Sequence, residues 1–148
     1  MSIQPHRVVI ADDNSLVLEG LSAFLEKDGM HVIGFARDGL EAVEVTRELN
    51  PDILLLDINM PKWNGFQALQ ALKKNGSSVR VIMLTAHDDP QLVNQALELG
   101  ADGFVSKDDG PFGLRGAIKT ALGGQFLFIG KTAFNTAIKK NKSTDELQ

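Results

Sequence analysis

The stretch ILLLDINMPKWNG, residues 53–65, is the part of the sequence that decides the fold. Four large apolar residues lead directly into Asp57, and a segment containing a proline and a glycine follows. A short apolar run bounded by turn residues predicts a strand that is buried on both faces of a parallel sheet. Asp57 then stands at the carboxyl end of that strand, which is where ligands bind in open parallel sheets.

Further apolar runs alternate along the chain with segments of helical spacing. This alternation predicts an α/β fold with a doubly wound, five-stranded parallel sheet and helices on both faces. The other strands are expected at residues 8–11, 32–35, 81–84 and 104–106, and the second and fifth have the character of edge strands. Five helices are expected, at about residues 17–25, 38–49, 65–73, 89–100 and 111–123. Asp38 and Asp89 are expected to cap the second and fourth helices, and Gly29 and Gly100 to follow the ends of the first and fourth.

Polar residues also stand at the ends of three other predicted strands. Asp12 and Asp13 end the first strand, Thr85 ends the fourth and Lys107 ends the fifth. Each alone could be a helix cap or a solvated side chain. Together with Asp57 they meet at one rim, where two carboxylates about 4 Å apart repel by roughly 4 kcal/mol at an effective dielectric of 20. The cluster therefore predicts a bound cation, and its oxygen ligands suit Mg²⁺.

With these residues identified, the chain resembles the receiver domain of two-component response regulators, which is CheY-like and flavodoxin-like in fold. The resemblance covers about residues 6–123, and its motifs are VVIADDN, LLLDINMP, MLTAH and GFVSK. The resemblance implies the strand order 2-1-3-4-5. Lys107 is followed by Asp108 instead of the proline of many receivers, and this form is similar to the NarL/FixJ-like subgroup with a LuxR-type helix-turn-helix output.

The resemblance implies a role for each residue at the rim. Asp57 accepts a phosphoryl group from a histidine kinase. Mg²⁺ is held by Asp13, Asp57 and the carbonyl of Asn59, while Asp12 acts mainly through a metal-bound water. Lys107 pairs with a phosphoryl oxygen.

Two further residues are implied to form a switch. The Thr85 hydroxyl moves to a phosphoryl oxygen and leaves space into which the ring of Phe104 turns. A strand phenylalanine also has a plain interpretation as a core residue. Asn59 and His87 lie two residues after Asp57 and Thr85, at positions that border the path of the hydrolytic water in this family.

Composition limits the partners and the compartment. A net charge of -4 and a pI near 5.3 argue against binding nucleic acid through a broad basic face. The chain has no cysteine, and no apolar run approaches the roughly 20 residues of a membrane span. We expect a cytoplasmic protein without membrane contact that is not an enzyme beyond Mg²⁺-dependent self-phosphorylation and self-dephosphorylation.

The expected domain organisation follows from the extent of the resemblance. Residues 1–124 are expected to form the receiver domain, and residues 125–148 an extension or linker toward an output domain absent from this chain. The expected partners are a sensor histidine kinase and, after phosphorylation, a second copy of the chain. DNA would be contacted only through the output domain. A freestanding receiver that acts by protein–protein contact is the alternative.

Two rival classes fit the rim residues less well. A phosphatase of the haloacid dehalogenase type needs a second aspartate two residues after the nucleophile, and that position is Asn59. A pseudo-receiver that serves only as a binding module commonly lacks one of the acidic pair, the acceptor or the lysine. All of these residues are present in this chain.

Overall fold

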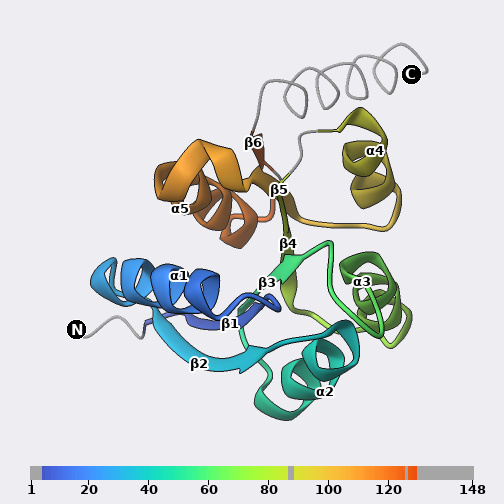
Figure 1. The fold of residues 1–148 in the computed structure, drawn as a ribbon, viewed down its shortest axis with the longest axis horizontal. Helices are drawn as coiled ribbons and strands as arrows, with labels where there is room; N and C mark the ends of the chain where they lie inside the picture. Colours follow the sequence, from blue (N-terminus) through green and yellow to red (C-terminus); the bar gives the residue numbers. More distant parts are fainter. Residues whose placement is uncertain (1–4, 87–88, 126, 130–148) are drawn as a thin grey trace.

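The computed structural model describes residues 5–86, 89–125 and 127–129. Its centre is a parallel sheet with the order β2-β1-β3-β4-β5-β6, so the predicted order 2-1-3-4-5 and the doubly wound fold are confirmed (Figure 1). The strands are β1 (Arg7–Ala11), β2 (His31–Ala36), β3 (Ile53–Asp57), β4 (Arg80–Thr85), β5 (Gly103–Ser106) and β6 (Leu127–Ile129). The helices are α1 (Ser15–Lys27), α2 (Gly39–Leu49), α3 (Gly65–Lys74), α4 (Pro90–Glu98) and α5 (Gly110–Leu122), with a 3-10 turn, η1 (Lys107–Asp109), before α5.

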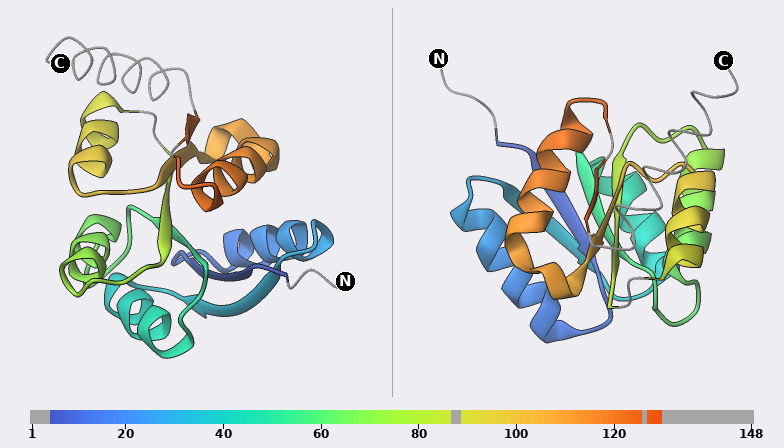
Figure 2. Two further views of the ribbon diagram at one scale, coloured as in Figure 1. Left: turned by 180° about the vertical axis from the view of Figure 1, so that it is seen from behind. Right: turned by 90° about the horizontal axis from the view of Figure 1, so that it is seen from above.

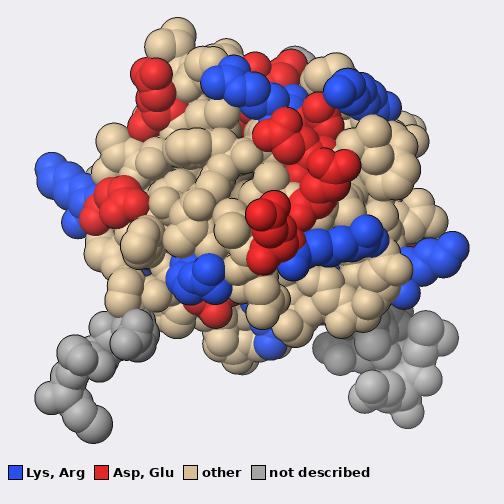
Figure 3. Space-filling view, turned by 90° about the horizontal axis from the view of Figure 1, so that it is seen from below, with Lys and Arg blue, Asp and Glu red and all other residues tan. Residues whose placement is uncertain are grey.

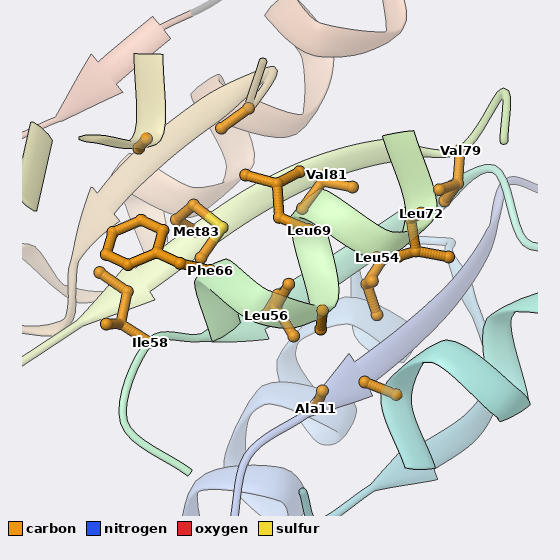
Figure 4. Packing of buried hydrophobic residues seen from close by; sticks show 14 of the residues in the cluster. Ala11, Leu54, Leu56, Ile58, Phe66, Leu69, Leu72, Val79, Val81 and Met83 are labelled. Atoms are coloured by element: carbon orange, nitrogen blue, oxygen red, sulfur yellow. The ribbon is translucent and has the colours of Figure 1, made fainter. Parts of the chain in front are cut away.

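Helices cover both faces of the sheet. α1 and α5 lie on one face, and α2, α3 and α4 lie on the other (Figures 1 and 2). Because successive side chains of a strand point to opposite faces, β3 contributes to two separate apolar clusters. Leu54 and Leu56 pack in the cluster on the α3 side, where Figure 4 shows them with Leu69, whereas Ile53 and Leu55 pack in the cluster under α1 and α5. This double burial explains the unbroken apolar run before Asp57.

Side-chain caps fix where the helices begin. Asp38 accepts a hydrogen bond from the amide of Glu41 at 2.8 Å and caps α2, and Asp89 caps α4, both as predicted. Asn14 caps α1 through the amide of Leu16 at 2.9 Å. The acidic pair that precedes Asn14 therefore does not serve as the cap of α1, which removes one plain structural explanation for it.

β6 is a strand that the sequence interpretation did not include. It pairs in parallel with β5, and Val105 stands opposite Ile129. The interpretation of the fifth strand as an edge is therefore wrong in the described structure, whereas β2 is an edge as expected. β6 begins after Gly124, and residues 130–148 of the expected extension lie outside the described residues.

Acidic and basic side chains are mixed on the side of the molecule seen from below in Figure 1. Figure 3 shows acidic groups in a band across this side, with lysine and arginine side chains scattered around them. The described residues on this side therefore form no broad basic face. None of the helices in the described ranges has the length and apolar character that crossing a membrane requires.

Candidate functional site

The carboxyl ends of the neighbouring strands β1, β3, β4 and β5 form one rim of the sheet. Asp12 and Asp13 follow β1, Asp57 is the last residue of β3, and Lys107 follows β5. β3 stands between β1 and β4, so Asp57 lies near the centre of this rim. The structure therefore brings the predicted acidic residues and the predicted lysine together.

Asp57 is the buried carboxylate at the centre of the cluster. Its side chain is 6% exposed. Burial, followed by the charge of Asp12, raises the pKa of Asp57 from 3.8 to about 6, although Lys107 and the backbone amide of Asn59 both favour the charged form. This raised pKa means that the neighbouring groups do not fully balance the negative charge of Asp57. A further positive charge at the site would therefore stabilise its ionised form.

Lys107 reaches from the end of β5 to two of the carboxylates. Its Nζ donates a hydrogen bond to Asp12 Oδ2 at 2.7 Å and lies 3.4 Å from Asp57 Oδ1. Burial lowers the pKa of Lys107, but the hydrogen bond to Asp12 and the charges of Asp57 and Asp12 outweigh it, so the pKa is raised above 10.5. The other oxygen of Asp12, Oδ1, accepts the amide of Asn14 at 2.9 Å. Lys107 therefore stays charged at neutral pH and holds the carboxylates of Asp12 and Asp57 close together.

The acidic cluster has the composition of a site for a hard divalent cation. One carboxylate oxygen from each of Asp12, Asp13 and Asp57 lies within 4.8 Å of the other two. Asp12 and Asp57 are buried, and Asp13 is exposed to solvent. Three carboxylates are balanced by one ammonium group, and an all-oxygen ligand set with access to water fits Mg²⁺. The residues present therefore fit the predicted metal.

Two glycines hold the loop between β3 and α3 against its neighbours. The amide of Gly65 donates to the carbonyl of Ile58 at 2.8 Å, and a Cβ at Gly65 would lie 2.3 Å from the carbonyl oxygen of Asp57. At the start of α2, the amide of Gly39 donates to the Trp63 carbonyl at 2.9 Å, and a Cβ there would lie 2.2 Å from that oxygen. Any larger residue at either position would displace the loop that follows Asp57.

Thr85 and Phe104 are both buried in this structure. Thr85 is the last residue of β4 and stands opposite Ser106 of β5. The Phe104 ring is fully buried in the same cluster as Val93 and Ala96 of α4. Phe104 therefore points into the core beneath α4, away from the face that α1 and α5 cover.

Sequence reasoning missed the two glycines that position the loop. Gly39 and Gly65 each follow a helix-capping residue directly, at a position where a better helix former would otherwise be favoured. A glycine there is the signal that could have indicated a close backbone contact. His87, which was expected beside the path of the hydrolytic water, lies outside the described residues.

Comparison with known families gives a match over most of the chain. The response regulator receiver domain family matches residues 8–119. The transcriptional regulatory protein LnrK of Bacillus subtilis (strain 168) is 43% identical over 103 residues, which are 69% of this chain and 47% of LnrK. This chain spans about half the length of the curated relatives it matches.

Solved structures with the same fold include regulators of the LuxR family. A two-component response regulator of that family from Aurantimonas sp. SI85-9A1 has a TM-score of 0.85 and 27% identity, over 93% of this chain and 99% of that one. The isolated receiver domain of RcsB from Salmonella enterica serovar Typhimurium, solved with the phosphomimetic BeF3-, has a TM-score of 0.80 and 25% identity, over 90% and 99% of the chains. A structure of two RcsB dimers bound to two parallel DNAs gives the same TM-score and identity, over 90% and 68%.

Proposed function

Since the chain belongs to the family of response regulator receiver domains, we propose that it accepts a phosphoryl group on Asp57 from a sensor histidine kinase. The observation that carries this proposal is the position of Asp57, which is a buried carboxylate between an acidic pair and a lysine that contacts it. A buried carboxylate with a raised pKa needs a functional or structural reason. Ion pairing of Lys107 with Asp12 and Asp57 alone would not require the third carboxylate of Asp13 beside them.

The proposed reaction is an in-line transfer to a carboxylate oxygen of Asp57. A bond forms between that oxygen and phosphorus, and the phosphorus–nitrogen bond to the kinase histidine breaks, so the electron pair of that bond leaves with the imidazole. Mg²⁺ held by Asp13, Asp57 and the carbonyl of Asn59, with Asp12 contributing through water, would supply positive charge against the phosphoryl oxygens. The contacts of Asp12 with Lys107 and with the Asn14 amide support its indirect role, because each of its oxygens already accepts one hydrogen bond and has less capacity left for a metal.

Lys107 is proposed to neutralise part of the charge that the phosphoryl group brings. In the described state its Nζ lies 3.4 Å from Asp57 Oδ1. A phosphoryl group on Asp57 removes the charge from that carboxylate oxygen and places phosphoryl oxygens beside it, so Lys107 can exchange one anionic partner for another without leaving the rim. The short bond to Asp12 limits how far the ammonium group moves.

We propose that Thr85 and Phe104 carry the change from the rim to the surface near α4. Thr85 stands at the end of the strand next to Asp57, and Phe104 packs beneath α4. Movement of the Thr85 hydroxyl toward the phosphoryl group would open space at the end of β4 beside β5, the strand that carries Phe104. The ring of Phe104 is fully buried here, so its reorientation would require α4 or the loop before it to adjust.

The proposed output is control of transcription, with pairing of two copies after phosphorylation. The support comes from relatives named as transcriptional regulatory proteins and from the structural likeness to RcsB, which is described as dimers bound to DNA. DNA contact would belong to an output domain outside this chain, and the cell compartment would be the cytoplasm. A freestanding receiver that acts through protein–protein contact is the second candidate, because the match lies in the receiver domain.

Phosphorylation of the purified protein with acetyl phosphate tests the proposal. With Mg²⁺, the intact mass should increase by one phosphoryl group, and mild base should remove it because an acyl phosphate hydrolyses readily. Asp57→Asn should show no gain, while Glu44→Gln, the same chemical change at an exposed position of α2, should behave as wild type. A base-labile gain that persists in Asp57→Asn, or a gain without Mg²⁺ at the same rate, would contradict the assignment.

A further inference from the structure

A cavity of about 290 Å³ lies between α1 and α5, next to the rim that carries Asp57. Its floor is formed by Leu84, Val105 and Leu114, each 2% exposed, from the ends of β4 and β5 and from α5. Half-buried side chains of α1 form the facing wall. The residues that line the cavity are Val17, Gly20, Leu21, Phe24, Leu84, Val105, Ser106, Lys107 and Leu114.

The chemistry of the lining selects an uncharged ligand. Among the described residues that line the cavity, all except Ser106 and Lys107 are apolar or glycine. The ammonium group of Lys107 already pairs with Asp12 at 2.7 Å and with Asp57 at 3.4 Å. Its positive charge is therefore largely neutralised, and it attracts a ligand in the cavity only weakly. An anionic ligand would also approach the carboxylates of Asp12 and Asp57, and their negative charges would repel it.

Gly20 stands in the middle of α1 and leaves the cavity open on that side. Glycine in a helix interior is unfavourable relative to alanine because it loses more backbone entropy. A Cβ at Gly20 would meet nothing within 4 Å, so no close contact requires a glycine at this position. Instead, its missing side chain widens the space beside Val17 and Phe24.

The cavity volume matches a small ring system. A cavity of about 150 Å³ lined by apolar side chains accepts benzene, and pockets for small molecules begin near 300 Å³. At about 290 Å³ the space between α1 and α5 is suited to a fused bicyclic molecule. We propose that this cavity is a binding site for an uncharged, mainly apolar small molecule of bicyclic size, which would contact the side chain of Lys107.

Titration with indole, observed by ¹H–¹⁵N amide spectra, tests the site directly. Indole is uncharged and bicyclic, and indole-3-acetate adds a carboxylate to the same rings. Indole should give saturable shifts at the amides of Gly20, Val105 and Leu114, and indole-3-acetate should bind more weakly. This measurement needs no phosphoryl group, so its failure would not affect the proposed phosphorylation of Asp57.

Two variants that fill the cavity provide the matched comparison. Gly20→Leu and Val17→Phe add side-chain volume at residues of the lining, and each should weaken indole binding by about tenfold or more because the added carbons occupy the space. Ala23→Leu adds leucine at an exposed position of the same helix and should bind as wild type. Circular dichroism would check that each variant keeps its helix content.

Several outcomes would overturn the proposal. These are the absence of saturable shifts up to the solubility of indole, shifts confined to residues away from α1, β5 and α5, and wild-type affinity in both filling variants. Tighter binding of indole-3-acetate would overturn the inference that the ligand is uncharged. Self-association that Gly20→Leu abolishes, without binding of indole, would show that the cavity takes a side chain of a second copy instead.

Discussion

Replacing Asp57 with asparagine should stabilise the metal-free protein at neutral pH. Asparagine keeps the shape of the side chain and removes a charge that is buried next to Asp12. The ionised form of Asp57 is unfavourable in the folded protein because burial and the charge of Asp12 together exceed the stabilisation that Lys107 provides. A residue proposed for function would thus lower the stability of the fold that carries it.

The pKa of Asp57 gives the size and the sign of the change in stability that Asp57→Asn should cause. A folded-state pKa of about 6, against 3.8 for the unfolded chain, means that folding favours the protonated form. The stability linked to that proton is fully present below 3.8 and is lost as the pH rises through about 6. Relative to low pH, the raised pKa of Asp57 lowers the stability by about 3 kcal/mol at pH 7.5 and by about 1 kcal/mol at pH 4.5.

Thermal and urea unfolding in EDTA would measure this cost. At pH 7.5 Asp57→Asn should unfold about 6 to 12 °C above wild type, using about 2 to 4 °C per kcal/mol for a chain of this size. At pH 4.5 the difference should shrink to about a third. Glu44→Gln, the same change at an exposed carboxylate of α2, should stay within about 0.5 kcal/mol of wild type at both pH values.

Added Mg²⁺ should narrow the difference between Asp57→Asn and wild type. The variant lacks the carboxylate of Asp57, one of the proposed ligands, so the cation should stabilise wild type more. The reasoning would be refuted if Asp57→Asn were no more stable than wild type at pH 7.5 in EDTA, or if the difference did not change between pH 4.5 and 7.5. Either result would mean that Lys107 compensates the Asp57 charge fully.

Three further predictions concern packing, the loop after Asp57 and assembly. Thr46→Val should stabilise the protein by about 1 kcal/mol in urea unfolding, because the buried Thr46 hydroxyl has no hydrogen-bond partner among the described residues; a loss of stability would point to a bound water there. Gly39→Ala should cost about 1 to 3 kcal/mol and change the Trp63 fluorescence, because its Cβ would meet the Trp63 carbonyl oxygen at 2.2 Å; unchanged fluorescence and stability would contradict the tight contact. Sedimentation with beryllofluoride and Mg²⁺ should show a heavier species than without them, and a monomer under both conditions would count against pairing through the receiver domain.

The sequence predicted those parts of the fold that depend on local pattern and burial. The apolar run before Asp57 indicated a strand covered on both sides, and Leu54 and Leu55 do pack on opposite faces of the sheet. Asp38 and Asp89 indicated helix starts because capping is a contact between residues close in the chain. The residues of the rim could be predicted to lie together from their positions at strand ends, because the carboxyl ends of parallel strands meet at one edge of the sheet.

The features that the sequence did not indicate depend on contacts between distant segments. β6 is three residues long and is defined by its pairing with β5, and a run of this length has no periodicity that identifies a strand. The contact between Gly39 and Trp63 joins the start of α2 to the loop before α3, two segments that are separate in the chain. The bond from Lys107 to Asp12 spans 95 positions, and its strength depends on burial that only the folded structure provides.

The direction of β6 decides on which side of the sheet the last described residue, Ile129, lies. α5 has 13 residues and starts next to the rim, so it carries the chain about 20 Å away from the site at about 1.5 Å per residue. β6 runs parallel to β5 and brings the chain back, with Ile129 paired to Val105, two residues before Lys107. A module tethered after Ile129 would have its attachment point near the edge that carries Asp57, and a short tether would suffice for direct contact between the module and that edge.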